Sequence, residues 1–161
     1  MKARDLMVQV DALLKADDEL KEYIEKIRIV RSKAETQGAR ALPVLDASGI
    51  PIGVLSMKDI LKAIYPPYMY STDLSLFTWD GMLESLAKNI SGKRVSEIMS
   101  SPVITVKGDH SLMECVDHML KHGISTIAVV DPTGRLTGMI YECQLFFAIA
   151  EALTGGKGNR K

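Results

Sequence analysis

A chain of 161 residues, 47% of them hydrophobic, can bury one compact core, and this composition excludes an intrinsically disordered protein. Its 20 acidic and 20 basic side chains balance, so no overall positive field attracts nucleic acid. No apolar stretch reaches the roughly 20 residues that span a bilayer, no signal-peptide pattern opens the chain, and two cysteines make no disulfide framework. We therefore expect a cytoplasmic protein without membrane or nucleic-acid partners.

The first predicted helix covers about residues 18–36. It opens on the acidic run 17–19, whose charges favour a helix N-terminus. Its apolar stripe consists of Leu20, Ile24, Ile27 and Val30.

Two strands and a short helix follow in the stretch GARALPVLDASGIPIGVLSMKD, residues 38–59. Pro66 and Pro67 end this helix, because proline cannot continue the hydrogen-bond ladder. A further helix is expected from Trp79 to about Asn89, with Thr78 as its N-cap and Gly92 beyond its end.

The last part of the chain gives a second set of elements. A strand is expected at 103–106, and Ser111 with Glu114 has the form of a capping box that starts a helix ending at Gly123. Strands at 126–130 and 136–140 and a closing helix at 142–153 complete this set. The glycine-rich residues 155–161 are expected to be disordered.

The second set repeats the first at a constant offset of 85 residues, at which Gly38 matches Gly123 and Gly53 matches Gly138. Both have the order strand, helix, strand, strand, helix. From Leu20 to the first of these glycines is 18 residues, whereas the corresponding distance in the second repeat, from Leu112, is 11. The seven additional residues equal about two helical turns, so we expect a longer first helix.

These repeats resemble the tandem CBS-domain pair, also called the Bateman module. The matching elements are residues 5–7 and 97–99 before the first strands, and the runs 42–46 and 127–131. The resemblance covers about residues 3–64 and 94–153 and implies an α+β fold of two βαββα repeats packed about a pseudo-twofold axis. We divide the chain accordingly into a first repeat, an inter-repeat helical insertion, a second repeat and a tail, at residues 1–65, 66–93, 94–154 and 155–161. The family also implies two clefts for adenosine-containing ligands and a disc-shaped dimer.

The strongest local signal for a binding site is the run from Gly53 to Asp59, GVLSMKD. Free amides at a helix start attract phosphate, and the Asp59 carboxylate offers two acceptors to a ribose diol. The resemblance implies that Asp59 holds the ribose, Ser56 the ribose or phosphate, and Arg40 the phosphates. It also implies that Val54 and Ile124 flank the adenine and that the strand from Ser101, including Val103, closes the pocket. A capping box explains Ser56 and Asp59 equally well, and Arg40 fits a solvated strand edge.

The second repeat departs from this pattern. Tyr141 replaces the Ser or Thr and Gln144 replaces the Asp, so we expect one competent cleft, at Asp59. A single cationic residue favours a monophosphate or an adenosine ligand with an uncharged tail over ATP. The candidate ligands are AMP, ADP, ATP and S-adenosylmethionine, and no cofactor is required.

Other constellations point to no metal and no catalysis. Cys115, His118 and His122 share one helix side and could present three ligands to Zn²⁺, but a structural site usually has four. A packed cysteine beside two exposed histidines is the simpler interpretation. No Ser-His-Asp, HExxH or Walker pattern occurs, so we expect no enzyme.

The closing helix is apolar around much of its circumference. If Leu145, Phe146, Ile149 and Leu153 face the core, Phe147 and Ala150 are left over, which indicates burial against a second copy. The helix 57–64 is expected to meet the same partner through Ile60, Leu61 and Ile64; the alternative is a cover from within the chain. The sequence therefore predicts a homodimeric regulatory module that signals to a separate, unidentified effector protein, or else a ligand-independent dimerisation scaffold.

Overall fold

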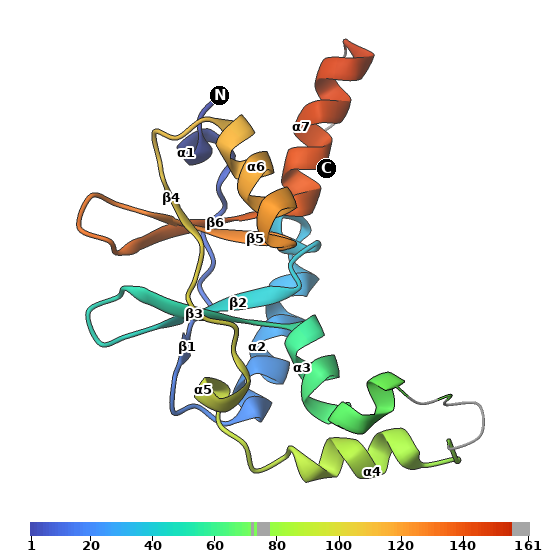
Figure 1. Cartoon of the computed structure of the whole chain (residues 1–161). Coiled ribbons are helices and arrows are strands. Elements are labelled where there is room, and N and C mark those ends of the chain that lie inside the picture. Colours follow the sequence, from blue (N-terminus) through green and yellow to red (C-terminus); the bar gives the residue numbers. More distant parts are fainter. Residues whose placement is uncertain (72, 74–77, 156–161) are drawn as a thin grey trace.

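The computed structural model of the chain describes residues 1–71, 73 and 78–155. Two three-stranded sheets, one from each repeat, form the centre of the molecule (Figure 1). The two hairpin turns lie on one side, and the helices α2, α3 and α7 gather on the other (Figure 1). The architecture is the expected α+β arrangement of two βαββα units.

The first repeat consists of β1 (Leu14–Lys15), α2 (Leu20–Ser32), β2 (Ala41–Leu45), β3 (Pro51–Ser56) and α3 (Met57–Ile64). The second consists of β4 (Thr105–Lys107), α6 (Leu112–His122), β5 (Thr126–Val130), β6 (Leu136–Tyr141) and α7 (Glu142–Thr154). Shorter elements precede or join them: α1 (Ala3–Leu6), the 3₁₀ helices η1 (Ala34–Thr36) and η2 (Pro67–Ser71), α4 (Met82–Asn89) and α5 (Val95–Ile98).

Both sheets have the same topology. The first strand runs parallel to the second, as in the pairing of Leu14 with Val44, and the second runs antiparallel to the third. Leu42 faces Leu55 in the first sheet, and at the repeat offset Ile127 faces Ile140 in the second. The duplicated sequence thus produces a duplicated register.

The segments that precede the first strand of each repeat are exchanged between the repeats. Val8 exchanges two backbone hydrogen bonds of 2.9 Å with Met139 of β6. Ser100 does the same with Val54 of β3, at 2.9 and 3.1 Å. Each repeat is therefore completed by backbone from the other side of the pseudo-twofold axis.

Two hydrophobic clusters form the core. The larger contains residues of both repeats, because Ala128, Met139 and Tyr141 join Leu42, Val44, Leu55 and the buried face of α2. The smaller lies under α6 and α7 and contains Cys115, Met119, Ile127, Val129 and Leu145. The shared cluster fixes the position of one repeat against the other.

The first helix is shorter than the expected 18–36, since α2 ends at Ser32 and exceeds α6 by two residues, 13 against 11. The buried hydroxyl of Thr36 donates to the carbonyl of Val30, and Lys33 has an extended backbone. This side chain satisfies a carbonyl at the helix end, so most of the additional residues form η1 and turns rather than two helical turns.

Two other boundaries also differ. The strand expected at 103–106 begins at Thr105, the first residue that pairs in register with β5. The insertion helix begins at Met82 rather than at Trp79, after Gly81 in a left-handed conformation of φ +85°. Because glycine tolerates that conformation best, Gly81 and not Thr78 sets the helix start. The tail predicted to be disordered lies, from residue 156 on, outside the described residues.

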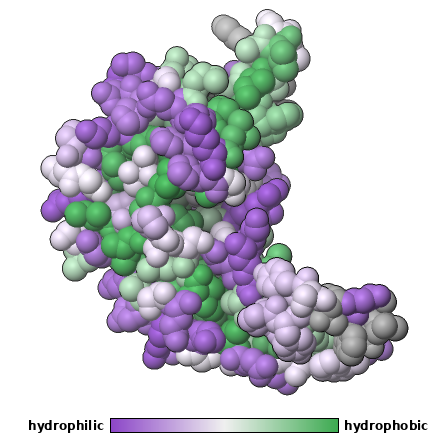
Figure 2. Space-filling model, viewed as in Figure 1, coloured by the Kyte–Doolittle hydropathy of each residue, from purple (hydrophilic) through white to green (hydrophobic). Residues whose placement is uncertain are grey.

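The prediction that Phe146, Ile149 and Leu153 face the core was wrong. Of the apolar residues on α7, Leu145 is buried, whereas Phe146 is 61% exposed and Leu153 is 81% exposed. The reason is that α7 extends away from the two sheets beyond its first turns (Figure 1). Apolar surface therefore covers this projecting arm (Figure 2).

Candidate functional site

The start of α3 forms a complete capping box. The Ser56 hydroxyl accepts a hydrogen bond of 3.1 Å from the Asp59 amide, and Asp59 Oδ2 accepts one of 2.9 Å from the Ser56 amide. The Ser56 hydroxyl also donates to Asp59 Oδ2 at 2.9 Å. The capping interpretation of this pair is confirmed, and a capping box leaves a ligand-binding role open because Oδ1 takes no part in it.

Asp59 is only 7% exposed, although aspartate is seldom buried unless it is paired. Its second oxygen, Oδ1, accepts a hydrogen bond of 2.7 Å from the Ser100 hydroxyl. Ser100 comes from the segment before β4 in the second repeat, so this bond joins the two repeats. A ribose hydroxyl bound to Oδ1 would take the position of the Ser100 hydroxyl.

Gly53 of β3 faces the same segment that supplies Ser100 to Asp59. A Cβ atom at this position would lie 2.6 Å from Met99 Sδ and 3.0 Å from the Ser100 carbonyl oxygen. The space beside the Gly53 backbone is thus taken by the Met99 side chain and the Ser100 carbonyl. Gly138 repeats the arrangement in the second repeat, where Met7 Sδ would be 2.8 Å away.

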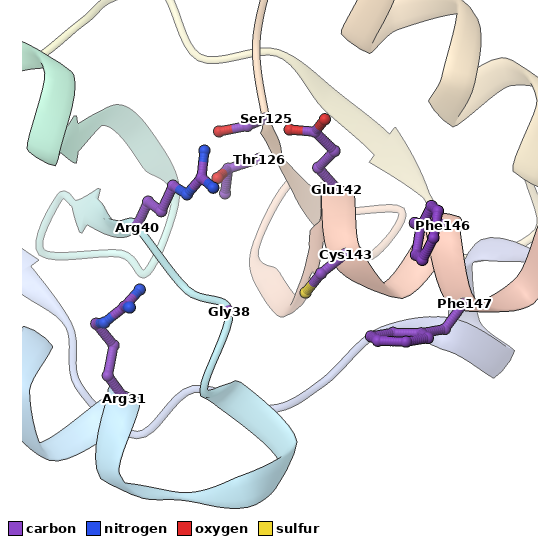
Figure 3. A pocket seen from close by; sticks show the side chains of 9 residues that line it. All are labelled: Arg31, Gly38, Arg40, Ser125, Thr126, Glu142, Cys143, Phe146 and Phe147. Atoms are coloured by element: carbon purple, nitrogen blue, oxygen red, sulfur yellow. The ribbon is translucent and has the colours of Figure 1, made fainter. Parts of the chain in front are cut away.

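Arg40 lies just before β2, and its carbonyl oxygen accepts a hydrogen bond of 2.9 Å from the amide of Met57, the first residue of α3. Its exposed side chain extends toward Ser125 and Thr126 of the second repeat (Figure 3). These residues line a pocket of about 360 Å³ between the repeats. The side chain of Arg40 therefore lies in a pocket between the repeats, while its backbone carbonyl contacts the start of α3.

Four other predicted ligand residues do not line this pocket: Val54, Ser101, Val103 and Ile124. Val54 is half-buried and is tied to Ser100 by the backbone bonds described above. Val103 and Ile124 are half-buried, and Ser101 is exposed. Ile124 packs against the smaller core cluster, and Val103 packs against the larger one.

Arg31 is a pocket residue that the sequence did not single out. Its guanidinium lies in the pocket with that of Arg40, and its Nη1 donates to the Ala39 carbonyl at 2.7 Å (Figure 3). Glu142 and Cys143 at the start of α7 also line this pocket. The only signal for Arg31 was a basic residue in the last turn of α2, which is ordinary for a helix C-terminus.

The corresponding position in the second repeat is built differently. The Tyr141 amide donates to Gln144 Oε1 at 2.8 Å, and Gln144 Nε2 donates to the Leu6 carbonyl at 3.3 Å. Tyr141 is 2% exposed, and its hydroxyl has no hydrogen-bond partner in the described part of the chain. Burial raises the pKa of this hydroxyl well above its ordinary value.

Cys115 is buried in the core, and the rings of His118 and His122 stack with centroids 5.8 Å apart. Among the described residues, no three histidine, cysteine or acidic side chains group as metal ligands do.

A second, more open depression of about 620 Å³ lies near the hairpin turns, between Asp11 and Arg135. None of the described helices is both long and apolar enough to cross a membrane.

Comparison with known proteins places the fold. The sequence profile of the CBS domain matches residues 3–66 and 95–151. The uncharacterized protein MJ1426 of Methanocaldococcus jannaschii is 30% identical over 141 residues, which are 80% of this chain and 81% of that protein. Protein MK0525 of Methanopyrus kandleri is 26% identical over 108 residues, 67% of this chain but 45% of its own length.

Solved structures agree with this result. CBSX2 from Arabidopsis thaliana superposes with a TM-score of 0.70 and 20% identity, covering 96% of this chain and 98% of that one. CBSX2 has also been solved in complex with AMP, and that structure superposes with a TM-score of 0.65, 19% identity and coverage of 94% and 98%. The CBS domain pair of protein MJ0100, solved with 5′-methylthioadenosine and S-adenosyl-L-methionine, has a TM-score of 0.67, 18% identity and coverage of 94% and 98%. With both repeats matched, the chain belongs to the CBS-domain family, as a tandem pair.

Proposed function

We propose that this protein is a regulatory module that binds an adenosine-containing nucleotide, with AMP favoured, in the cleft at the start of α3. The observation that carries the proposal is a carboxylate, Asp59, buried at the N-terminus of α3. The first amide of this helix, that of Met57, donates to the carbonyl of Arg40, a residue that lines a pocket together with Arg31. A buried carboxylate can accept the hydroxyls of a ribose, and the positive end of a helix dipole favours phosphate. The AMP complex of CBSX2 and the adenosine-ligand complex of MJ0100 support this class of ligand.

The positions of the arginines support a short phosphate tail. The carbonyl of Arg40 accepts the amide of Met57, the residue after Ser56 of the capping box. Arg31 lines the same pocket as Arg40. Glu142 lines this pocket too, and its negative charge disfavours the larger charge of a triphosphate. AMP is therefore favoured over ADP and ATP, with S-adenosylmethionine as the cationic competitor.

Calorimetric titration with AMP, ADP, ATP and S-adenosylmethionine tests the site. We expect Asp59→Asn to weaken AMP binding by about 100-fold, because a hydrogen bond to a charged group contributes about 1.5–3 kcal/mol. Gln144→Ala, the matched change in the second repeat, is expected to keep the wild-type affinity. Thermal unfolding of each variant shows whether the fold is retained, and wild-type affinity in a folded Asp59→Asn protein would refute the site.

A ligand-independent scaffold is the second candidate. The specific observation in its favour is that Ser100 and Met99 already occupy the space beside Asp59 and Gly53. In this role the tandem CBS repeats would dimerise and dock an effector protein without sensing a nucleotide. A thermal-shift screen separates the two functions, because a ligand that binds the native state raises the unfolding temperature and a scaffold gives no shift.

We further propose that two copies associate and that an unidentified effector protein responds to the shape of the dimer. The exposed apolar surface of α7 supports a second copy, since contiguous patches of this kind usually mark contacts. A nucleotide can shift such a dimer only by binding one shape better than another. The free thiols of Cys115 and Cys143 support a cytoplasmic location.

A further inference from the structure

The thiol of Cys143 lies in the pocket between the repeats. Cys143 is the second residue of α7, and its half-buried side chain is turned toward the backbone of Gly38 (Figure 3). A Cβ atom at Gly38 would collide with Cys143 Sγ and would lie 3.2 Å from Cys143 Cβ. Gly38 does not adopt a left-handed conformation, unlike its repeat counterpart Gly123 at φ +62°. The missing side chain at Gly38 therefore makes room for the thiol.

The two cysteines of the chain differ in accessibility. Cys115 is fully buried in the smaller core cluster, and burial raises the pKa of its thiol. Because the thiolate is the attacking species in disulfide exchange, a buried thiol with a raised pKa is inert. Cys143 instead lines a pocket of about 360 Å³, where a small molecule can reach it. Of the two thiols, that of Cys143 is the one open to modification.

The charged groups around this thiol favour an acidic molecule. Arg31 and Arg40 line the pocket, and the Arg31 guanidinium is held by its hydrogen bond of 2.7 Å to the Ala39 carbonyl. Glu142 is the acidic side chain of the lining, so the two arginines leave an excess of positive charge. A guanidinium can bind a carboxylate through two parallel hydrogen bonds. The pocket thus suits a molecule with a carboxylate better than an uncharged one.

A buried hydroxyl in the same pocket also lacks a partner. Thr126 is 8% exposed, and its Oγ1 makes no hydrogen bond within the described part of the chain. Its side chain lies beside the guanidinium of Arg40 (Figure 3). Burying a hydroxyl without a hydrogen bond is unfavourable, and a carboxylate bound by Arg40 would accept from it. This unsatisfied donor points to a ligand independently of the cysteine.

The pseudo-twofold axis does not repeat this site. At the offset of 85 residues, Lys58 corresponds to Cys143 and Ser125 corresponds to Arg40. A Cβ atom at Gly123, the counterpart of Gly38, would meet nothing within 4 Å. The thiol, its cation and the space made by the glycine thus occur together at the start of α7 and not at the start of α3.

We infer that Cys143 is a modification site for small organic disulfides that carry a carboxylate. Arg31, Arg40 and the Thr126 hydroxyl bind the carboxylate, while the Cys143 thiolate attacks the nearer sulfur of the disulfide. A new S–S bond forms at Cys143 Sγ, the S–S bond of the reagent breaks, and its second sulfur leaves as a thiolate with the electron pair. The proton of the Cys143 thiol passes to solvent, and excess free thiol reverses the modification. The site goes beyond the proposed function, because it needs no nucleotide.

Two disulfides of similar size test the site on the full-length protein. Dithiodiglycolate carries a carboxylate on each half, whereas bis(hydroxyethyl) disulfide is uncharged. Intact mass spectrometry follows the formation of the mixed disulfide, and peptide mapping locates it. We expect both reagents to modify Cys143 and neither to modify Cys115, with no adduct in Cys143→Ser.

Arg40→Gln is expected to slow the reaction with dithiodiglycolate about fivefold, the effect of losing one unit-charge attraction at close range in water. Thr126→Val is expected to slow it about tenfold, because the carboxylate loses a charge-assisted hydrogen bond. Both variants are expected to keep the wild-type rate with bis(hydroxyethyl) disulfide, which shows that the fold and the exposure of Cys143 are retained. Arg135→Gln, near the hairpin turns, is the matched control and is expected to react like the wild type with both reagents.

Two results would overturn the inference. The first is the absence of an adduct on Cys143. The second is a wild-type rate with dithiodiglycolate in either Arg40→Gln or Thr126→Val, because the carboxylate would then not be bound as inferred. The AMP titration of Asp59→Asn tests the proposed function separately, since Asp59 does not line this pocket.

Discussion

The proposed function depends on Asp59, and the two oxygens of its carboxylate have different partners. Oδ2 serves the local cap with Ser56, whereas Oδ1 accepts a hydroxyl from Ser100, 41 residues away in sequence. The first interaction stabilises the start of α3, and the second ties the repeats together. A nucleotide that binds through Oδ1 must compete with the second interaction and can leave the first intact.

Ser100→Ala is therefore expected to bind AMP about tenfold more tightly, because the ribose no longer displaces a protein hydroxyl from Oδ1. The same change is expected to lower the free energy of unfolding by roughly 1–2 kcal/mol. Calorimetry and urea unfolding measure the two effects, with Ser96→Ala as an exposed control. An affinity equal to or weaker than that of the wild type would show that Ser100 does not compete with the ligand.

Among the elements, the starts of α3 and α6 were well predicted from sequence. The Ser111 hydroxyl accepts a hydrogen bond of 3.2 Å from the Glu114 amide, as the capping motif indicated. The Glu114 carboxylate does not close the box but pairs with His110 Nδ1 at 3.1 Å. One half of the motif thus forms as predicted, and a neighbouring side chain takes the other half.

Ser111→Ala is expected to destabilise the protein by about 1 kcal/mol, because α6 loses the acceptor for one of its free amides. Ser111→Gly is expected to cost only a few tenths of a kcal/mol, since glycine is tolerated at an N-cap. Chemical unfolding of both variants measures the difference. Equal losses would mean that the hydroxyl does not act as a cap.

Helix ends and exposed faces were predicted less well. The end of α2 depends on the Thr36 hydroxyl reaching the Val30 carbonyl, and the start of α4 depends on the conformation of Gly81. On α7 the apolar periodicity was recognised, but its outer residues face away from the core. Periodicity shows that a stripe is apolar, whereas the packing partner is decided by the direction in which the helix leaves the sheet.

At the scale of the whole molecule, buried tyrosines make the stability sensitive to alkaline pH. Burial raises the pKa of Tyr141 above its ordinary value of 10.0 in the folded state. A raised pKa means that the folded protein holds its proton more tightly than the unfolded chain does. The resulting stabilisation is complete below pH 10 and is lost as the pH rises above the pKa of the unfolded chain.

Tyr141→Phe is expected to reduce this loss between about pH 10 and 11, because the titrating group is removed. At pH 7 the change is expected to be nearly neutral or slightly stabilising, since the Tyr141 hydroxyl is buried without a partner in the described structure. Urea unfolding across this pH range measures both effects, with the exposed Tyr70→Phe as control. An unchanged alkaline loss of stability in Tyr141→Phe would contradict this role.

The sequence by itself determined the repeat, the order of its elements and the caps at Ser56 and Ser111. These features follow from short-range periodicity and from hydrogen bonds between residues three apart, which the sequence displays directly. Tertiary structure alone decided that Ser100 bonds Asp59, that Arg31 joins Arg40 in one pocket, and that the apolar face of α7 is exposed. These contacts depend on exchanged segments and on the packing of one repeat against the other, which bring together residues that no local pattern relates.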